Sequence, residues 1–153
     1  MRKFFVPFFL LSLILTGCKN NSTGISSSLN MQNTTETNRT VEYNYEDLGE
    51  KLIYWDDVPI INLDHYYVYF FSRTCNHCQR IKNLVIPILL KRRIYYGCEA
   101  SSEHQICSVT MIGKIGEIDF CILGYPTIIE IKNREVIHNV SGENEVLSFL
   151  NSK

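Results

Sequence analysis

Two cysteines three positions apart, Cys75 and Cys78, mark the point where a predicted strand meets a predicted helix. The stretch HYYVYFFS at 65–72 is a run of aromatic and β-branched residues, which is typical of a buried central strand. Apolar residues at helical spacing follow Asn76 and comprise Ile81, Leu84, Val85, Ile88 and Leu89. We therefore expect the pair at the carboxyl end of a strand and in the first turn of a helix.

The expected position of the pair suits thiol–disulfide exchange. At a helix N-terminus, unpaired backbone N–H groups and the positive end of the helix dipole stabilise a thiolate. A thiolate exchanges disulfides by attacking a sulfur atom, which gives a mixed disulfide. The spacing therefore predicts Cys75 as the nucleophile and Cys78, one turn further into the helix, as the resolving thiol of a redox-active disulfide.

His77 lies between the two cysteines and is a further catalytic candidate. An imidazole N–H or an imidazolium can stabilise the Cys75 thiolate. Any group that stabilises the reduced pair raises its reduction potential and makes the disulfide a stronger oxidant. The alternative interpretation is an exposed residue of the first helical turn without such a role.

Zinc binding is an alternative interpretation of the cysteine pair. Structural zinc sites take four ligands, commonly from two short-spaced pairs. Further ligand atoms are available from Cys98, His104, Cys107 and Cys121, but the sequence contains no second C-x-x-C. We therefore expect neither a metal nor another cofactor.

Three other cysteines, Cys98, Cys107 and Cys121, remain to be assigned. Cys98 and Cys107 flank a short polar segment, and a structural disulfide between them would staple it. Cys121 would then be a buried free thiol. Bridges from Cys98 to Cys121 or from Cys107 to Cys121 are open alternatives.

The N-terminal residues have the composition of a targeting segment. Arg2 and Lys3 precede an uncharged stretch, FFVPFFLLSLILTG at 4–17, which is shorter than the ~20 residues of a membrane-spanning helix. LTGC at 15–18 resembles the signal of bacterial lipoproteins. That resemblance implies cleavage before Cys18, a diacylglycerol on its sulfur, and a chain anchored by lipid on the extracytoplasmic face of the cell membrane. An ordinary secretory signal with a chance cysteine is the alternative.

Either kind of signal exports the chain to a compartment where disulfides persist. Residues 18–44 are rich in Asn, Ser and Thr and offer little apolar surface, so we expect a flexible tether there and a folded domain at 45–153. A eukaryotic secretory pathway is an alternative host, which four N-x-S/T sequons permit. The formal net charge of −1 provides no strong basic field, so nucleic acid is not an expected partner.

The second half of the domain begins with a polar loop, YGCEASSEHQIC at 96–107. The elements expected after it are a strand at 108–112, a helix at 113–123, strands at 124–131 and 134–140, and an amphipathic helix at 143–151. Asn133 and Arg134 separate the last two strands and should form a hairpin turn.

This order of elements resembles the thioredoxin superfamily. Two local signatures carry the resemblance, FFSRTCNHCQRIK at 70–82 and GYPTIIEIKNREVI at 124–137, and the match covers roughly residues 45–152. It implies a thioredoxin-like α/β fold in which helices flank a central mixed β-sheet. It also implies that Pro126 is a cis-proline facing the cysteine pair, and that Tyr125, Pro126 and Thr127 bind the substrate chain.

Several residues depart from the pattern of thioredoxin itself. Thr74 replaces the usual tryptophan, Tyr69 stands where a buried acid assists proton transfer, and the inner dipeptide is Asn76-His77. A histidine at this dipeptide position resembles the disulfide-introducing branch of the superfamily. As a whole, the chain is similar to small, membrane-tethered, thioredoxin-like bacterial lipoproteins.

The expected function is therefore that of an extracytoplasmic, membrane-tethered thiol–disulfide oxidoreductase that favours oxidation or isomerisation. Its partners would be cysteine-containing exported proteins, a membrane redox partner and, through the lipid anchor, the membrane. The alternatives are a dedicated disulfide reductase and a non-catalytic module that binds an exported peptide in the groove beside Pro126.

Overall fold

The computed structural model describes residues 41–153 except 102, 105–106, 108–109 and 116–120. All of these residues fall within Asn38–Lys153, one of the two units into which the chain divides. The predicted signal segment 1–17, the predicted lipidation site Cys18 and residues 18–40 of the predicted tether lie outside the described residues. Within the described part of the chain, none of the helices reaches the length and apolar character that a membrane span requires.

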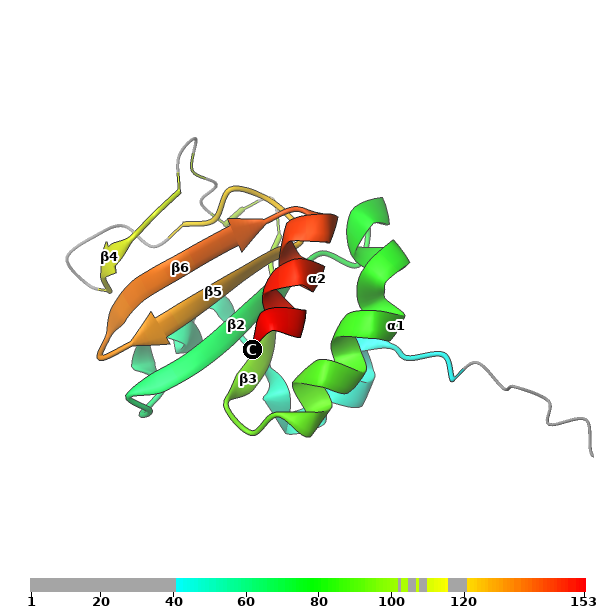
Figure 1. Ribbon diagram of the computed structural model, residues 1–153, viewed down its shortest axis with the longest axis horizontal. Coiled ribbons are helices and arrows are strands. Elements are labelled where there is room, and N and C mark those ends of the chain that lie inside the picture. Colours follow the sequence, from blue (N-terminus) through cyan, green and yellow to red (C-terminus); the bar gives the residue numbers. More distant parts are fainter. Residues whose placement is uncertain (1–40, 102, 105–106, 108–109, 116–120) are drawn as a thin grey trace, which may run out of the picture. The chain divides into compact units, whose positions relative to one another are not determined.

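A six-stranded mixed sheet forms the centre of the fold, with strand order β1-β3-β2-β5-β6-β4 (Figure 1). The elements are η1 (Tyr45–Lys51), β1 (Leu52–Ile53), η2 (Trp55–Ile60), β2 (His65–Phe71), α1 (Asn76–Lys91), β3 (Tyr95–Glu99), β4 (Gly113–Lys114), β5 (Thr127–Lys132), β6 (Glu135–Ser141) and α2 (Glu143–Ser152). β1, β3 and β2 are parallel, whereas the pairs β2–β5, β5–β6 and β6–β4 are antiparallel. The expected thioredoxin-like α/β fold is confirmed.

The central strand β2 is buried on both faces. Alternate side chains of a strand point to opposite faces of its sheet, so one strand can supply two cores. The first core lies against η1, α1 and α2 and contains Tyr67, Tyr69 and Phe71. The second core includes η2 and contains Tyr66, Val68 and Phe70. Figure 1 shows α1 and α2 side by side, which agrees with their shared place in the first core.

The segments 70–82 and 124–137, which carry the resemblance, fold into the strands and helices that the sequence predicts for them. β2 ends just before the pair, α1 begins at Asn76, and the last two strands and the final helix are present. The hairpin turn is also confirmed, because Asn133 and Arg134 have φ values of +52° and +63°. Positive φ at both central residues is the geometry that matches the twist of a two-residue hairpin.

The segment between the signatures differs from the expectation. The segment 96–107, expected to be a loop, begins with β3. Gly97 lies inside this strand because Leu48 packs against it: a Cβ at this position would lie only 2.5 Å from Cδ1 of Leu48. Residues 110–112 form no strand, so that part of the expected strand at 108–112 is wrong. The helix expected at 113–123 is also wrong in its described parts, which contain β4 and the non-helical residues 121–123.

Glu130 of β5 is a buried carboxylate in the first-core face of the sheet. Its oxygens accept hydrogen bonds from Tyr67 Oη at 2.8 Å and Lys153 Nζ at 2.8 Å, and they contact ring nitrogens of His65 at 2.8 Å and His138 at 2.9 Å. Burial acts to raise the pKa of Glu130, but the hydrogen bonds from Lys153, Tyr67 and His65 outweigh it and lower the pKa to about 2. The folded chain therefore favours the ionised carboxylate.

We expect Glu130→Gln to lower the free energy of unfolding at pH 7 by about 2 to 3 kcal/mol, the size associated with a carboxyl shift of this kind. A depressed folded-state pKa stabilises the fold above the ordinary carboxyl pKa, and this contribution is lost as the pH falls from about 4.5 towards about 2. Urea unfolding at several pH values measures it, with the exposed Glu135→Gln as the control. A difference between Glu130→Gln and the unmodified chain that stays constant down to pH 2 would contradict the assignment.

Candidate active site

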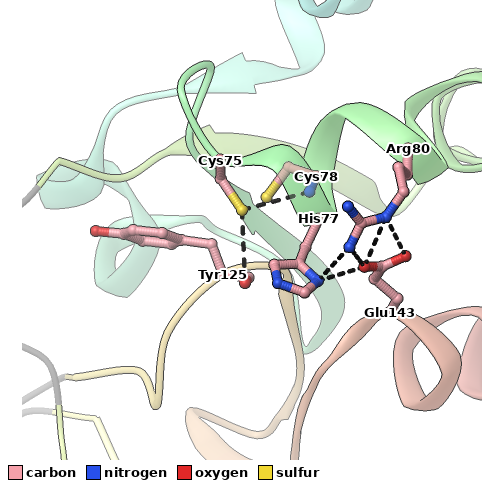
Figure 2. Close-up of polar contacts among 6 residues, drawn as sticks. All are labelled: Cys75, His77, Cys78, Arg80, Tyr125 and Glu143. Atoms are coloured by element: carbon pink, nitrogen blue, oxygen red, sulfur yellow. Dashed lines mark hydrogen bonds and ion pairs between the residues drawn. The ribbon is translucent and has the colours of Figure 1, made fainter.

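Cys75 is the N-cap residue of α1, directly after the turn that follows β2. Its sulfur accepts a hydrogen bond from the backbone N–H of Cys78 at 3.3 Å and lies 3.7 Å from the carbonyl oxygen of Tyr125 (Figure 2). The Tyr125–Pro126 peptide bond is cis. The expected cis-proline beside the cysteine pair is thus confirmed, and it follows Tyr125 immediately before β5.

The two sulfur atoms have different access to solvent. Cys75 is half-buried, whereas Cys78 is completely buried in the first core. Burial raises the pKa of Cys78 to about 12. A thiol or disulfide from another protein can therefore reach only Cys75 of the two. This asymmetry agrees with Cys75 as the attacking or attacked sulfur and Cys78 as the resolving one.

His77 belongs to a charged cluster between the first turns of α1 and α2. Its Nδ1 contacts a carboxylate oxygen of Glu143 and lies 2.7 Å from Nη2 of Arg80, and the Arg80 guanidinium is bonded to the same carboxylate (Figure 2). The hydrogen bond from Arg80 is the main cause that holds the pKa of Glu143 below its usual range, and the contact with His77 lowers it further. The hydrogen bonds described for His77 therefore go to this cluster and not to Cys75.

Arg80 and Glu143 were not among the residues that the sequence singled out. Arg80 follows His77 by three positions on a predicted helix, a spacing that puts two side chains on one face, so this contact had a local signal. Glu143 comes from the other end of the domain. Only the packing of α2 beside α1 brings its carboxylate to the active site.

The three predicted substrate-binding residues are placed differently from one another. Tyr125 is partly exposed beside Cys75, and its hydroxyl donates a hydrogen bond to the carbonyl of Ser101 at 2.8 Å. Pro126 is buried. Thr127 has no exposed surface, and its hydroxyl donates to the carbonyl of Gly124 at 2.8 Å. The side chain of Thr127 therefore closes the turn inside the protein, and the assignment of Thr127 to substrate binding stays a prediction that only its backbone could fulfil.

The predicted Cys98–Cys107 disulfide is also wrong. The structure joins Cys107 to Cys121, and Cys98 is a buried free thiol of β3. The backbone N–H of Cys107 donates to the carbonyl of Ile122 at 2.8 Å, which aligns it with Cys121, whereas Cys98 packs into the second core. This bridge also takes two of the cysteines that the zinc interpretation would need.

No protein-family model and no curated protein sequence matches this chain. Similar solved structures are thioredoxins, among them a variant from Halobacterium salinarum NRC-1 with 15% identity, a TM-score of 0.41, and coverage of 66% of this chain and 88% of that one. Thioredoxin f from spinach chloroplast has 13% identity, a TM-score of 0.43 and coverage of 70% and 89%. Malassezia sympodialis thioredoxin has 14% identity and a TM-score of 0.40, and the match covers 66% of this chain and 87% of that one. The fold assignment rests on the strand order, the cysteine pair and the cis-proline described above.

We expect simultaneous replacement of Cys107 and Cys121 by serine to lower the free energy of unfolding by about 3 kcal/mol, because the bridge closes a loop of 14 residues. Peptide mapping without reduction should show the linked pair in the unmodified chain and in Cys98→Ala. Loss of the linked peptide in Cys98→Ala would instead mean that Cys98 takes part in the bridge.

Proposed function

We propose, from a thioredoxin-like fold whose cysteine pair lies beside a cis-proline, that this chain is a thiol–disulfide oxidoreductase. The observation that carries the proposal is the position of the Cys75 sulfur. It is half-exposed, accepts a helix N-terminal N–H, and lies 3.7 Å from the carbonyl that precedes Pro126. N–H groups at a helix N-terminus favour negative charge on a nearby sulfur, and the exposed part of Cys75 can be approached by a second chain.

The proposed reaction transfers two electrons from a substrate dithiol to the Cys75–Cys78 disulfide. A substrate thiolate attacks the accessible Cys75 sulfur, the disulfide bond breaks, and its electron pair leaves on Cys78. The second substrate thiolate then attacks the mixed disulfide and releases Cys75 as a thiolate. The substrate gains a disulfide, the protein gains a dithiol, and two protons end on the dithiol or in solvent. A membrane redox partner that accepts two electrons would regenerate the disulfide.

The proposed direction, oxidation or isomerisation, is supported by the cluster at His77. Glu143 and Arg80 hold the imidazole in the first turn of α1, two residues after the nucleophile. The N–H groups of this turn favour a thiolate at Cys75, and the imidazole would act on it only through space, since its hydrogen bonds go to Glu143 and Arg80. Because the disulfide has no charge to stabilise, these groups favour the reduced pair and raise its reduction potential.

The proposed location is the extracytoplasmic face of a cell membrane. It is supported by the sequence alone, through the charged start, the apolar stretch and the lipoprotein-like LTGC ending at Cys18. Residues 18–44 would act as a tether between the lipid anchor and the domain. In that location the substrates are cysteines of exported proteins, where disulfides persist.

We expect Cys78→Ser to accumulate mixed disulfides with exported proteins, because the remaining Cys75 thiolate attacks a partner but is not released by Cys78. Cys75→Ser should accumulate none and should lose oxidative refolding of a reduced test protein. Non-reducing electrophoresis and mass spectrometry measure the first effect. If Cys75→Ser refolds the test protein as fast as the unmodified chain, the oxidoreductase proposal fails, and a peptide-binding module becomes the better one.

We expect His77→Pro to lower the reduction potential of the cysteine pair by about 30 mV, a tenfold shift in its exchange equilibrium. Proline is tolerated in the first turn of a helix, so α1 should persist. Equilibration in glutathione buffers measures the potential, with the neighbouring exposed Asn76→Ala as the control. An unchanged potential in His77→Pro would dismiss the tuning role.

A further inference from the structure

Tyr125 connects the nucleophile to a turn at Ser101. Its carbonyl oxygen lies 3.7 Å from the Cys75 sulfur, and Figure 2 shows its ring extending away from Glu143. The hydroxyl at the end of that ring donates a hydrogen bond to the backbone carbonyl of Ser101 at 2.8 Å. Because the ring is partly exposed beside Cys75, a chain bound at the sulfur would contact it, and the Ser101 carbonyl fixes where the ring lies.

His104 holds the backbone of Ser101 in place. Its Nδ1 accepts the backbone N–H of Ser101 at 2.7 Å and lies 3.2 Å from the Ser101 hydroxyl oxygen, while its own backbone N–H donates to the Ser101 carbonyl at 3.1 Å. The backbone N–H of Glu103 adds a hydrogen bond to the Ser101 hydroxyl at 3.3 Å. These bonds close a turn, and the turn fixes the direction in which the Ser101 carbonyl points.

The same imidazole seats the turn on the folded domain. The His104 ring stacks on Trp55, with 4.6 Å between the ring centroids and 23° between the ring planes. Trp55 in turn packs against the second core. The turn thus contacts the second-core side of the domain through His104 and the candidate active site through Tyr125.

We propose that His104 is a positioning residue for thiol–disulfide exchange at Cys75, and that it acts through the hydrogen bond from the Tyr125 hydroxyl to Ser101. The proposal rests on the proposed function. Nδ1 of His104 accepts the Ser101 N–H only while it carries no proton, so the ring proton is on Nε2. A partly exposed tyrosine can take several positions, and fixing one of them removes an ordering cost that substrate binding would otherwise include.

The contacts of His104 act on substrate binding and not on the redox equilibrium of the cysteine pair. The side-chain contacts described for His104 go to Ser101 and Trp55 and to neither sulfur. The Tyr125 carbonyl belongs to the backbone that enters β5, so loss of the side-chain hydrogen bond leaves it beside Cys75. The rate of exchange with a protein substrate should therefore depend on His104, whereas the reduction potential should not.

The test is His104→Ala in the full chain, with His104→Asn as the conservative variant. The side-chain oxygen of asparagine can replace Nδ1 as an acceptor, whereas alanine has none. We expect His104→Ala to lower the rate of exchange with a reduced test protein, measured well below saturation, by about fivefold, the size of one hydrogen bond. His104→Asn should restore most of that rate, and equilibration with glutathione should give both variants an unchanged potential. An unchanged rate in His104→Ala, a shifted potential, or no recovery in His104→Asn would overturn the proposal.

Tyr125→Phe tests the route, because it removes only the hydroxyl. It should slow the exchange about as much as His104→Ala, and the two substitutions together should slow it no more than either alone, since both break the same series of contacts. Additive losses would mean that His104 acts by another route, and the proposal would fail. The matched control is His138→Ala, which also removes an imidazole bonded through Nδ1, but to Glu130. Its rate should be unchanged; a loss as large as that of His104→Ala would also overturn the proposal.

Amide hydrogen exchange, followed by NMR, tests the contacts without any substrate. The backbone N–H of Ser101 is bonded to Nδ1 of His104, so its exchange with solvent should be slow in the unmodified chain. His104→Ala and Tyr125→Phe should both speed this exchange, and His104→Asn should slow it again. Unaltered exchange in Tyr125→Phe would overturn the proposal even if Cys75→Ser shows that the chain does not oxidise proteins. If His104→Ala does not fold, Tyr125→Phe and His104→Asn decide the test through the same two measurements.

Discussion

The pairing of β2 with β5 is the constraint on which the candidate active site depends. Phe70, close to the end of β2, lies opposite Thr127, the first residue of β5. This register places the preceding Tyr125–Pro126 bond at the end of the central strand β2 from which the chain enters α1. The Tyr125 carbonyl oxygen therefore lies 3.7 Å from the Cys75 sulfur. A slip of one residue would turn every side chain of β5 to the other face of the sheet and would separate Glu130 from the Tyr67 hydroxyl.

Both α-helices begin at the same end of the sheet. α1 begins at Asn76 and α2 at Glu143, and the first turns of the two helices are joined through His77, Arg80 and the Glu143 carboxylate. Helix N-termini present N–H groups and positive dipole ends, so anionic groups are stabilised near them. Glu143 is such an anion for α2, and a Cys75 thiolate would be one for α1.

The cysteine pair thus has different surroundings on its solvent-exposed side and on its buried side. On the exposed side are charged groups that solvent screens, and on the buried side is the first core, which Cys78 shares with the aromatic residues Tyr45 and Tyr69. Groups on the exposed side act through charge and change with salt. On the buried side the Tyr45 hydroxyl donates one directed hydrogen bond to the carbonyl of Cys78, where water does not compete for it.

Local sequence patterns anticipated the parts of the site that are held by neighbouring residues. The aromatic strand, the C-x-x-C at a helix start and the Asn133–Arg134 turn each follow from a few consecutive side chains, whereas the cis-proline was implied by the resemblance to the thioredoxin superfamily. The disulfide between Cys107 and Cys121 did not follow from such a pattern, because three cysteines can pair in several ways and only folded geometry selects one. β3 was missed since a short strand with an internal glycine has too weak a pattern, although its glycine is required by the packing of Leu48.

The amino-acid sequence by itself predicted the thioredoxin-like fold class, through a resemblance carried by two local signatures, and it placed the Cys75–Cys78 pair at the start of a helix, because that position depends on short-range periodicity and spacing. Only the tertiary structure decided that Glu143 reaches His77 and that Glu130 accepts a hydrogen bond from Tyr67. Each of these is a contact between segments distant in sequence. Such contacts depend on strand register and helix packing, which no local pattern of residues specifies.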